Sequence, residues 1–164
     1  MRKILAIDPG DQESGYVIWD GKVVSNKGKI PNEIMLDSIS KMIGEPSEEP
    51  LELAIEMVAS YGMPVGKNIF DTCVWIGRFI QEYESIIGYN YKKVYRQEVK
   101  MHLCKSTRAK DSNVIQALVD RFGNVNEHGK YGKGTKKNKG FFYEFSDDIW
   151  QAFAVAVYYF DTYK

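Results

Sequence analysis

The chain has 164 residues, the length of one ordinary domain, with 44% hydrophobic, 13% aromatic and 27% charged residues. This composition excludes disordered and fibrous chains, and the length excludes large two-domain ATPases and ordinary (β/α)₈ barrels. The longest apolar run, Ala152 to Phe160, is far shorter than the ~20 residues that cross a bilayer. The N-terminal apolar run reaches an acid too early to be a signal peptide. We therefore expect a single cytoplasmic domain over residues 1–164.

The cysteines and histidines indicate neither a disulfide nor a zinc site. Cys73 and Cys104 lie far apart in the sequence, which suits a reduced, cytosolic protein. His102 and His128 form no pair with the spacing of zinc ligands.

The net charge of the chain is zero, but the charge is unevenly distributed. Residues 92–140 contain thirteen Lys or Arg and four Asp or Glu, a local charge of +9, which leaves −9 for the rest. Two solvated faces would also produce such a split. We interpret it as a polyanion-binding surface beside a carboxylate metal site.

The first half of the chain is predicted to form a strand meander, a helix and a further strand. Apolar runs that end in Asp8 and Glu56 are typical of strands, and Asp20-Gly21 is a hairpin turn signal. In chain order, the expected elements are strands at 3–8, 15–20 and 22–24, a helix at 31–44 and a strand at 51–56.

The second half is predicted to be mainly helical. Residues 123–140, rich in Gly, Lys and Asn, are expected to form a mobile basic loop, although a merely solvated loop would have the same composition. The order of elements predicts a mixed α/β sheet with helices on its faces. The expected elements are a helix at 69–87, a strand at 92–95, helices at 97–104 and 111–122, and a last helix that Ser146 caps.

Four acids stand where ligands commonly bind. Asp8 and Glu56 each end an apolar strand, and Asp147 and Asp148 lie in the first turn of the last helix. Acids at strand ends face the crevice beyond a sheet, whereas acids at a helix start also complement the helix dipole. An acid at the end of an apolar strand costs desolvation free energy unless it is paired or bound to a metal.

Converging carboxylates repel one another, and a hard divalent cation relieves that repulsion. Oxygen ligands suit Mg²⁺ or Mn²⁺. Two such ions about 4 Å apart can activate a water molecule and stabilise the leaving oxygen of a phosphodiester. We therefore expect Mg²⁺ or Mn²⁺, two ions per site.

Four short motifs occur in order along nearly the whole chain. They are Ala6-Ile7-Asp8-Pro9-Gly10 with Gly15 following, Leu53-Ala54-Ile55-Glu56, a basic region comprising 97–100, 109–111 and 114–119, and the helix at 147–156. Together they resemble the motifs of the RuvC-like Holliday junction resolvases. The resemblance implies an RNase H-like α/β fold with a five-stranded sheet in the order 3-2-1-4-5. It also implies a homodimer that binds four-way DNA junctions and cuts two strands symmetrically. The Lys-rich insertion at 123–140 is similar to the phage-encoded branch, which implies the cytoplasm of a host cell.

The resemblance makes Asp8, Glu56 and Asp148 the catalytic and metal-binding acids. Gln151 stands where the family has its last acid; its carbonyl can bind a cation, but without charge. Asp147 is expected to compensate as a lesser catalytic and metal-binding residue.

Basic and aromatic residues complete the set of candidates. The loop at 61–68 is longer than the bacterial pattern, and Tyr61 and Met63 are candidates for a junction wedge or for covering the core. Aromatic residues of the 69–87 helix are expected in the core or at a dimer interface; they are Phe70, Trp75 and Phe79. The residues expected to contact DNA phosphates are Lys100, Lys105, Arg108, Lys110, Lys133, Lys136, Lys137 and Lys139.

The sequence predicts a metal-dependent endonuclease for branched DNA, and other functions stay open. Because Gln151 replaces an acid, the chain could instead be a branched-DNA-binding protein with weak or lost catalysis. The same carboxylate chemistry would serve a nuclease on RNA–DNA hybrids. A sugar-kinase-type phosphotransferase would need two domains and a second glycine-rich turn, and the sequence has neither.

Overall fold

The computed structural model describes residues 2–44 and 49–163. Within these ranges one mixed sheet has the strand order β3-β2-β1-β4-β5, as predicted. The strands are β1 (Ile4–Asp8), β2 (Glu13–Trp19), β3 (Val24–Pro31), β4 (Glu52–Met57) and β5 (Tyr91–Tyr95). The helices are α1 (Asn32–Ile43), α2 (Lys67–Ile87), α3 (Arg96–Cys104), α4 (Asp111–Phe122), α5 (Val125–His128) and α6 (Asp147–Thr162), with a 3₁₀ turn η1 (Lys130–Gly132).

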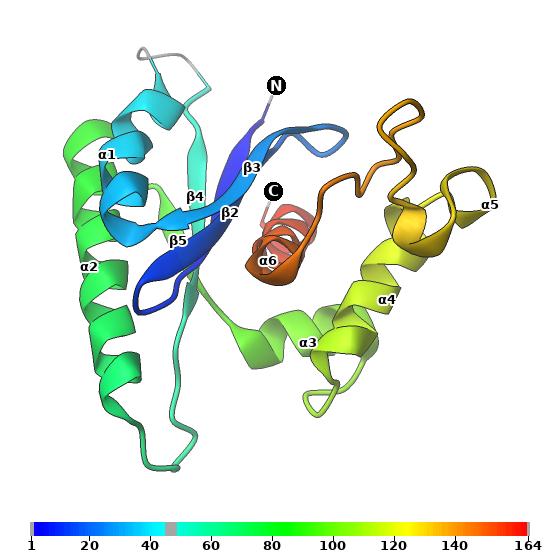
Figure 1. Ribbon diagram of the computed structural model, residues 1–164. Coiled ribbons are helices and arrows are strands. Elements are labelled where there is room, and N and C mark those ends of the chain that lie inside the picture. Colours follow the sequence, from blue (N-terminus) through cyan, green and yellow to red (C-terminus); the bar gives the residue numbers. More distant parts are fainter. Residues whose placement is uncertain (1, 45–48, 164) are drawn as a thin grey trace.

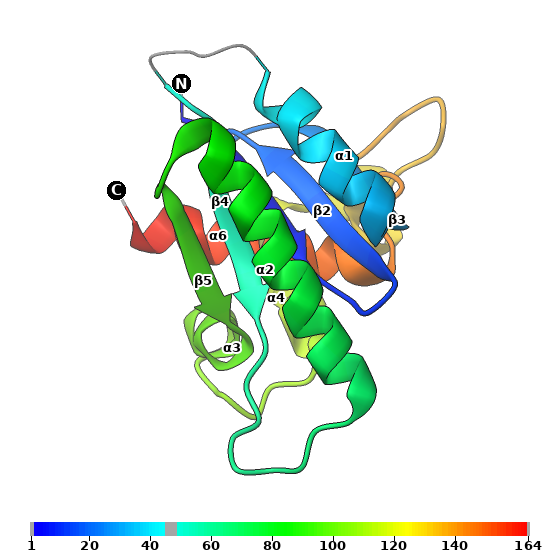
Figure 2. The same ribbon diagram turned by 90° about the vertical axis from the view of Figure 1, so that its left-hand side faces the viewer.

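Helices cover both faces of the sheet. Helices α1 and α2 lie on one face, and α6, with α3 and α4 beyond it, lies on the other (Figure 1). Figure 2 shows α2 running across the first of these faces. The alternation along β1 explains this arrangement, because Ile4 and Ala6 pack into the core beneath α6 whereas Leu5 and Ile7 pack beneath α1 and α2. A strand buried on both faces reads as the continuous apolar run seen in the sequence.

The directions of the strands set the position of the site. Strands β1, β2 and β3 form an antiparallel meander, whereas β4 and β5 run parallel to β1. The ends of β1, β4 and β5 therefore meet at one edge of the sheet, which is where ligands bind in open α/β folds.

Two segments differ from expectation. The third strand was expected only at 22–24, but β3 continues to Pro31 as an edge strand paired with β2. The basic segment, 123–140, was read as loop throughout, but it contains α5, η1 and an antiparallel bridge between Gly134 and Lys139. Its mobility stays a prediction.

Buried aromatic side chains hold the base of the basic segment against α6. Phe142 and Phe145 are almost completely buried, and the ring centroid of Phe142 lies 4.6 Å from that of Trp150. The lysines of the segment therefore project from a packed base.

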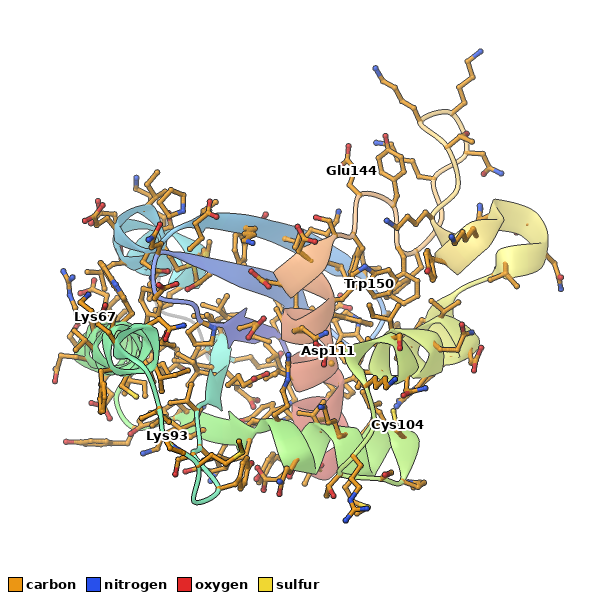
Figure 3. All side chains as sticks on the ribbon, turned by 60° about the horizontal axis from the view of Figure 1, so that its bottom comes forward. Lys67, Lys93, Cys104, Asp111, Glu144 and Trp150 are labelled. Carbon is orange, nitrogen blue, oxygen red and sulfur yellow. The ribbon has the colours of Figure 1, made fainter. Side chains whose placement is uncertain are left out.

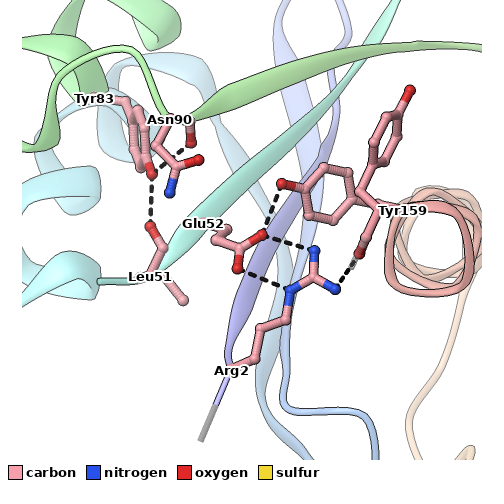
Figure 4. A network of polar contacts seen from close by, with 7 residues as sticks. Arg2, Leu51, Glu52, Tyr83, Asn90 and Tyr159 are labelled. Carbon is pink, nitrogen blue, oxygen red and sulfur yellow. Dashed lines mark hydrogen bonds and ion pairs between the residues drawn. The ribbon is translucent and has the colours of Figure 1, made fainter. Parts of the chain in front are cut away.

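The far end of α6 is fixed to β4 by a polar network (Figure 4). The Arg2 guanidinium forms a bidentate ion pair with Glu52, at 2.8 Å to each carboxylate oxygen, and also donates to the Tyr163 carbonyl. The Tyr159 hydroxyl donates to Glu52 at 2.7 Å. Burial and this carboxylate raise the pKa of Tyr159 to about 12. Nearby, the buried Tyr83 hydroxyl lies 2.7 Å from the Leu51 carbonyl oxygen. These contacts fix the C-terminal half of α6, so its first turn is held over the opposite edge of the sheet.

Among the helices of the described ranges, none combines the length and apolar content needed to cross a membrane.

Candidate active site

Asp8 and Glu56 lie side by side at the edge of the sheet. Ile7 of β1 pairs with Ile55 of β4, and each acid is the next residue of its strand. Burial is the main cause that raises the pKa of Asp8 well above its ordinary value, and repulsion from Glu56 adds to it. Burial also raises the pKa of Glu56. The predicted pair of carboxylates is therefore close enough for the charge of Glu56 to disfavour ionisation of Asp8.

Gly15 brings the first turn of α6 over this pair. It lies opposite Asp8 on β2, and a Cβ at this position would be 2.6 Å from the backbone carbonyl carbon of Asp148. A side chain here would push α6 away from the sheet. With glycine, Asp148 approaches closely enough to raise the pKa of Asp8 further. Its carboxylate also pairs with Lys29 of β3, with 2.9 Å between Nζ and Oδ2.

Asp147 lies at the margin of the site. Its backbone has φ of 35°, in the left-handed region, and the residue is exposed. The expected Ser146 cap makes no side-chain hydrogen bond to the helix.

Arg96, which no sequence motif marks, contacts three elements at the site, β4, α4 and α6. Its guanidinium donates to Gln151 at 2.9 Å and lies 3.3 Å from Glu56 and 3.4 Å from Asp111. Burial works against its charge, but Glu56, Asp111 and Asp8 outweigh that effect and raise the pKa of Arg96. Arg96 directly follows β5, whose end lies next to the end of β4. That position at the sheet edge was the signal that could have found it.

Asp111 is a further carboxylate at the site. It begins α4 and lies between α4 and α6 (Figure 3), and its charge helps to raise the pKa of both Asp8 and Glu56. In the sequence it stands among basic residues and reads as part of the DNA-binding segment. Asp111 is therefore an acid that lines the same groove as Gln151, and the compensating role expected of Asp147 stays a prediction.

An open groove of about 370 Å³ lies beside the partly buried Asp8 and Glu56. Its lining residues are Lys29, Arg96, Asp111, Ile115, Asp147, Asp148 and Gln151. In this conformation no group of three His, Cys, Asp or Glu side chains in the described ranges is arranged to hold a cation. The donor set nevertheless fits a hard divalent cation, because mutually repelling carboxylates and one amide carbonyl converge from four elements. Arg96 now supplies the positive charge among them.

The predicted DNA-binding residues fall into two groups. One lies on α3 and the following turn, and the other lies in the basic segment, so the two stand at opposite ends of α4 (Figure 1). Lys100 is partly buried and near enough to the site to oppose the raised pKa of Glu56. The exposed residues of the first group are Lys105, Arg108 and Lys110; in the second, Lys136, Lys137 and Lys139 are exposed and Lys133 is partly buried.

The aromatic candidates separate into core and surface. Phe79 is completely buried and Trp75 is partly buried against it, whereas Phe70 is 62% exposed. Tyr61 and Met63 are 56% and 72% exposed on the loop before α2, so they do not cover the core.

Comparison with known proteins supports the fold through structure rather than sequence. No protein-family model matches the chain, and no curated protein matches its sequence. The fold is similar to RuvC of T. thermophilus in complex with a Holliday junction substrate, with a TM-score of 0.68 and 12% identity, covering 97% of this chain and 93% of that one. It is also similar to a second Thermus thermophilus RuvC structure, with a TM-score of 0.64 and 13% identity, covering 97% of this chain and 95% of that one. The RNase H-like fold implied by the sequence motifs is confirmed: the chain has the fold of RuvC.

Proposed function

We propose that the protein is a metal-dependent endonuclease that hydrolyses phosphodiesters in branched DNA, with the Holliday junction as its leading substrate. The observation that carries this proposal is that Asp8 and Glu56 end neighbouring strands beneath the first turn of α6, where Asp148 lies over Gly15. Burial and repulsion from Glu56 and Asp148 make Asp8 harder to ionise, and the attraction of Arg96 offsets this only in part. A site that concentrates negative charge in this way favours a divalent cation. The structural neighbour bound to a Holliday junction supports the choice of substrate.

The residues have distinct proposed roles. Asp8, Glu56 and Asp148 would hold Mg²⁺ or Mn²⁺, with the Gln151 carbonyl as a neutral ligand and Asp147 at the margin. Two ions bound there would activate a water molecule and stabilise the leaving oxygen of the phosphodiester. Arg96 balances the charge of the carboxylates and orients Gln151, whose amide oxygen accepts its hydrogen bond.

We also propose a homodimer that works in the cytoplasm, the host's if the protein is phage-encoded. Cutting a two-fold junction symmetrically needs two active sites related by a two-fold axis. On the outer side of α2, Phe70 and Val74 are each 62% exposed, and an apolar surface of this kind suits a subunit interface. Sedimentation with and without DNA at micromolar concentration tests this assembly, and a stable monomer under both conditions would contradict it.

A branched-DNA-binding protein with weak catalysis is the second candidate. The observation that favours it is the neutral Gln151, together with the Arg96 cation already present among the carboxylates. This candidate predicts tight junction binding without cleavage in either Mg²⁺ or Mn²⁺.

A substrate panel separates these functions. The protein should be incubated with Mg²⁺, Mn²⁺ or EDTA and with a four-way junction, a flap, a linear duplex and an RNA–DNA hybrid of matched sequence. The proposed function predicts paired cuts in the junction that require the metal. Cleavage of the hybrid alone would instead identify a nuclease for RNA–DNA hybrids.

A further inference from the structure

A second groove lies along the edge strand β3, toward the end of that strand that pairs with Trp19. It has a volume of about 330 Å³, at the lower end of the range of ligand pockets, so it is too small for a duplex and large enough for part of a single strand. It is formed by the turn between β2 and β3, by β3 and by the chain that leads into α6. Its lining residues are Lys22, Val23, Val24, Lys27, Lys139, Gly140, Phe141, Tyr143 and Glu144.

The charge of this groove suits a polyanion. Three lysines from three segments, Lys22, Lys27 and Lys139, face one acid, Glu144. Figure 3 shows Glu144 on the chain before α6, on the side away from Lys67 and Lys93. The excess of positive charge comes from residues far apart in sequence, so the fold assembles it.

Strand β3 connects this groove to the carboxylate site. Lys27 pairs with Val17 and Lys29 with Gly15, so both lysines belong to the face of the sheet that α6 covers. Lys29 contacts Asp148, and Lys27 lies 5.7 Å from the centre of the Phe145 ring. Two residues of a strand span about 7 Å, which is about two nucleotide steps along a stacked strand. Two lysines of one strand therefore connect the two places, Lys29 at the site, where it is paired with Asp148, and Lys27 in the groove.

The groove also offers a surface for a nucleobase. Tyr143 is partly exposed in its lining, and the Lys139 ammonium lies 4.9 Å from the centre of the Tyr143 ring. Proteins that bind single strands combine such positive grooves with aromatic rings on which bases stack.

We propose that this groove binds the continuation of the DNA strand whose phosphodiester lies at the carboxylate site. Lys22, Lys27 and Lys139 contact its phosphates, and an unpaired base stacks on Tyr143. The inference rests on the proposed nuclease function, because it takes the direction of the strand from the position of the carboxylates. It adds a strand-binding path to the two predicted groups of DNA-binding residues.

Binding measured without cleavage tests the path. Fluorescence anisotropy in EDTA should compare the wild type with Lys22→Gln/Lys27→Gln, using a labelled four-way junction and a labelled single-stranded oligonucleotide across a salt series. Lys41→Gln/Lys67→Gln removes the same charge from exposed positions on α1 and α2 and serves as the control. We expect the groove variant to bind both probes roughly tenfold more weakly at 50 mM salt. For the oligonucleotide, the slope of log affinity against log salt concentration should become shallower by about 1.4, because each of two lost phosphate contacts on a single strand removes about 0.7. The ring is tested separately, because Tyr143→Ser should weaken oligonucleotide binding whereas Tyr143→Phe should not.

The inference is overturned if the groove variant and the control variant show the same affinity and the same salt slope. It is also overturned if Tyr143→Ser binds the oligonucleotide as the wild type does. Failure of the proposed nuclease function would look different. In that case the wild type would show no metal-dependent cleavage, while the groove variant would still bind DNA more weakly than the wild type.

Discussion

Replacing Arg96 with methionine tests how the carboxylates of the site are balanced. The change removes a guanidinium that contacts Glu56, Gln151 and Asp111 while keeping most of the apolar stem. Removing one partner of a fully buried ion pair costs about 3–5 kcal/mol. Here the Arg96 side chain is 32% exposed and its two carboxylate contacts are long, at 3.3 and 3.4 Å, so solvent screening reduces the cost. We expect a loss of about 2 kcal/mol, or roughly 4–8 °C in Tm for a domain of this size.

Thermal unfolding at pH 7.5, in EDTA and then in Mg²⁺ or Mn²⁺, measures this effect. Without Arg96, the carboxylates depend more on an added cation, so the metal should raise the Tm of Arg96→Met by more than that of the wild type. Arg78→Met is the matched control, because Arg78 lies over the Trp75 ring on the far face, 4.3 Å from its centre. The reasoning is refuted if Arg96→Met in EDTA is as stable as Arg78→Met and gains no additional stability from metal.

Three further predictions follow from contacts of the same site and of the basic segment. In EDTA, the raised pKa of Asp8 stabilises the folded state below the ordinary aspartate pKa, and this stability is lost as pH rises through the higher folded-state pKa. Asp8→Asn should remove that loss, which urea unfolding from pH 4 to pH 8 measures. An unchanged pH profile would contradict the prediction. Gly15→Ala should lower the free energy of unfolding by about 1–3 kcal/mol and the cleavage rate at least tenfold, since the added methyl group would lie 2.6 Å from the backbone of Asp148. Normal stability and cleavage would show that α6 does not pack as described. Replacing Lys133, Lys136, Lys137 and Lys139 with alanine should weaken junction binding and flatten its salt dependence by about 0.9 per lost duplex phosphate contact; unchanged affinity and slope would exclude the basic segment as a phosphate-contacting element.

The parts of the fold that follow a regular apolar pattern were predictable from sequence. The runs that end in Asp8 and Glu56 identified two adjacent strands and the edge at which they end. Strand β3 was predicted too short because Ser25 to Lys29 is polar and glycine-containing; an edge strand needs only one partner and tolerates such residues. The basic segment was read as loop because its composition is polar, while the residues that anchor it, Phe142 and Phe145, follow it in the sequence.

The positions of the candidate acids were predictable where position along an element decides them. Acids at strand ends and in the first turn of a helix could be listed from sequence, whereas the contribution of Arg96 and Asp111 depends on how α3 and α4 pack beside α6. Both residues lie within residues 92–140, whose positive net charge predicts DNA binding rather than a place in the active site. Gly15 was recognised through the motif, and its physical role became visible only with the backbone of Asp148 above it.

Metal-dependent cleavage by point variants tests the central claim most directly. Single-turnover cleavage of a four-way junction in Mg²⁺ should be measured for the wild type, Asp8→Asn, Glu56→Gln, Asp148→Asn and Asp147→Asn, with junction binding in EDTA measured alongside. The account predicts that the first three variants bind the junction at least as tightly as the wild type but do not cut it, and that Asp147→Asn only cuts more slowly. Normal cleavage by Asp148→Asn together with loss of cleavage by Asp147→Asn would contradict it.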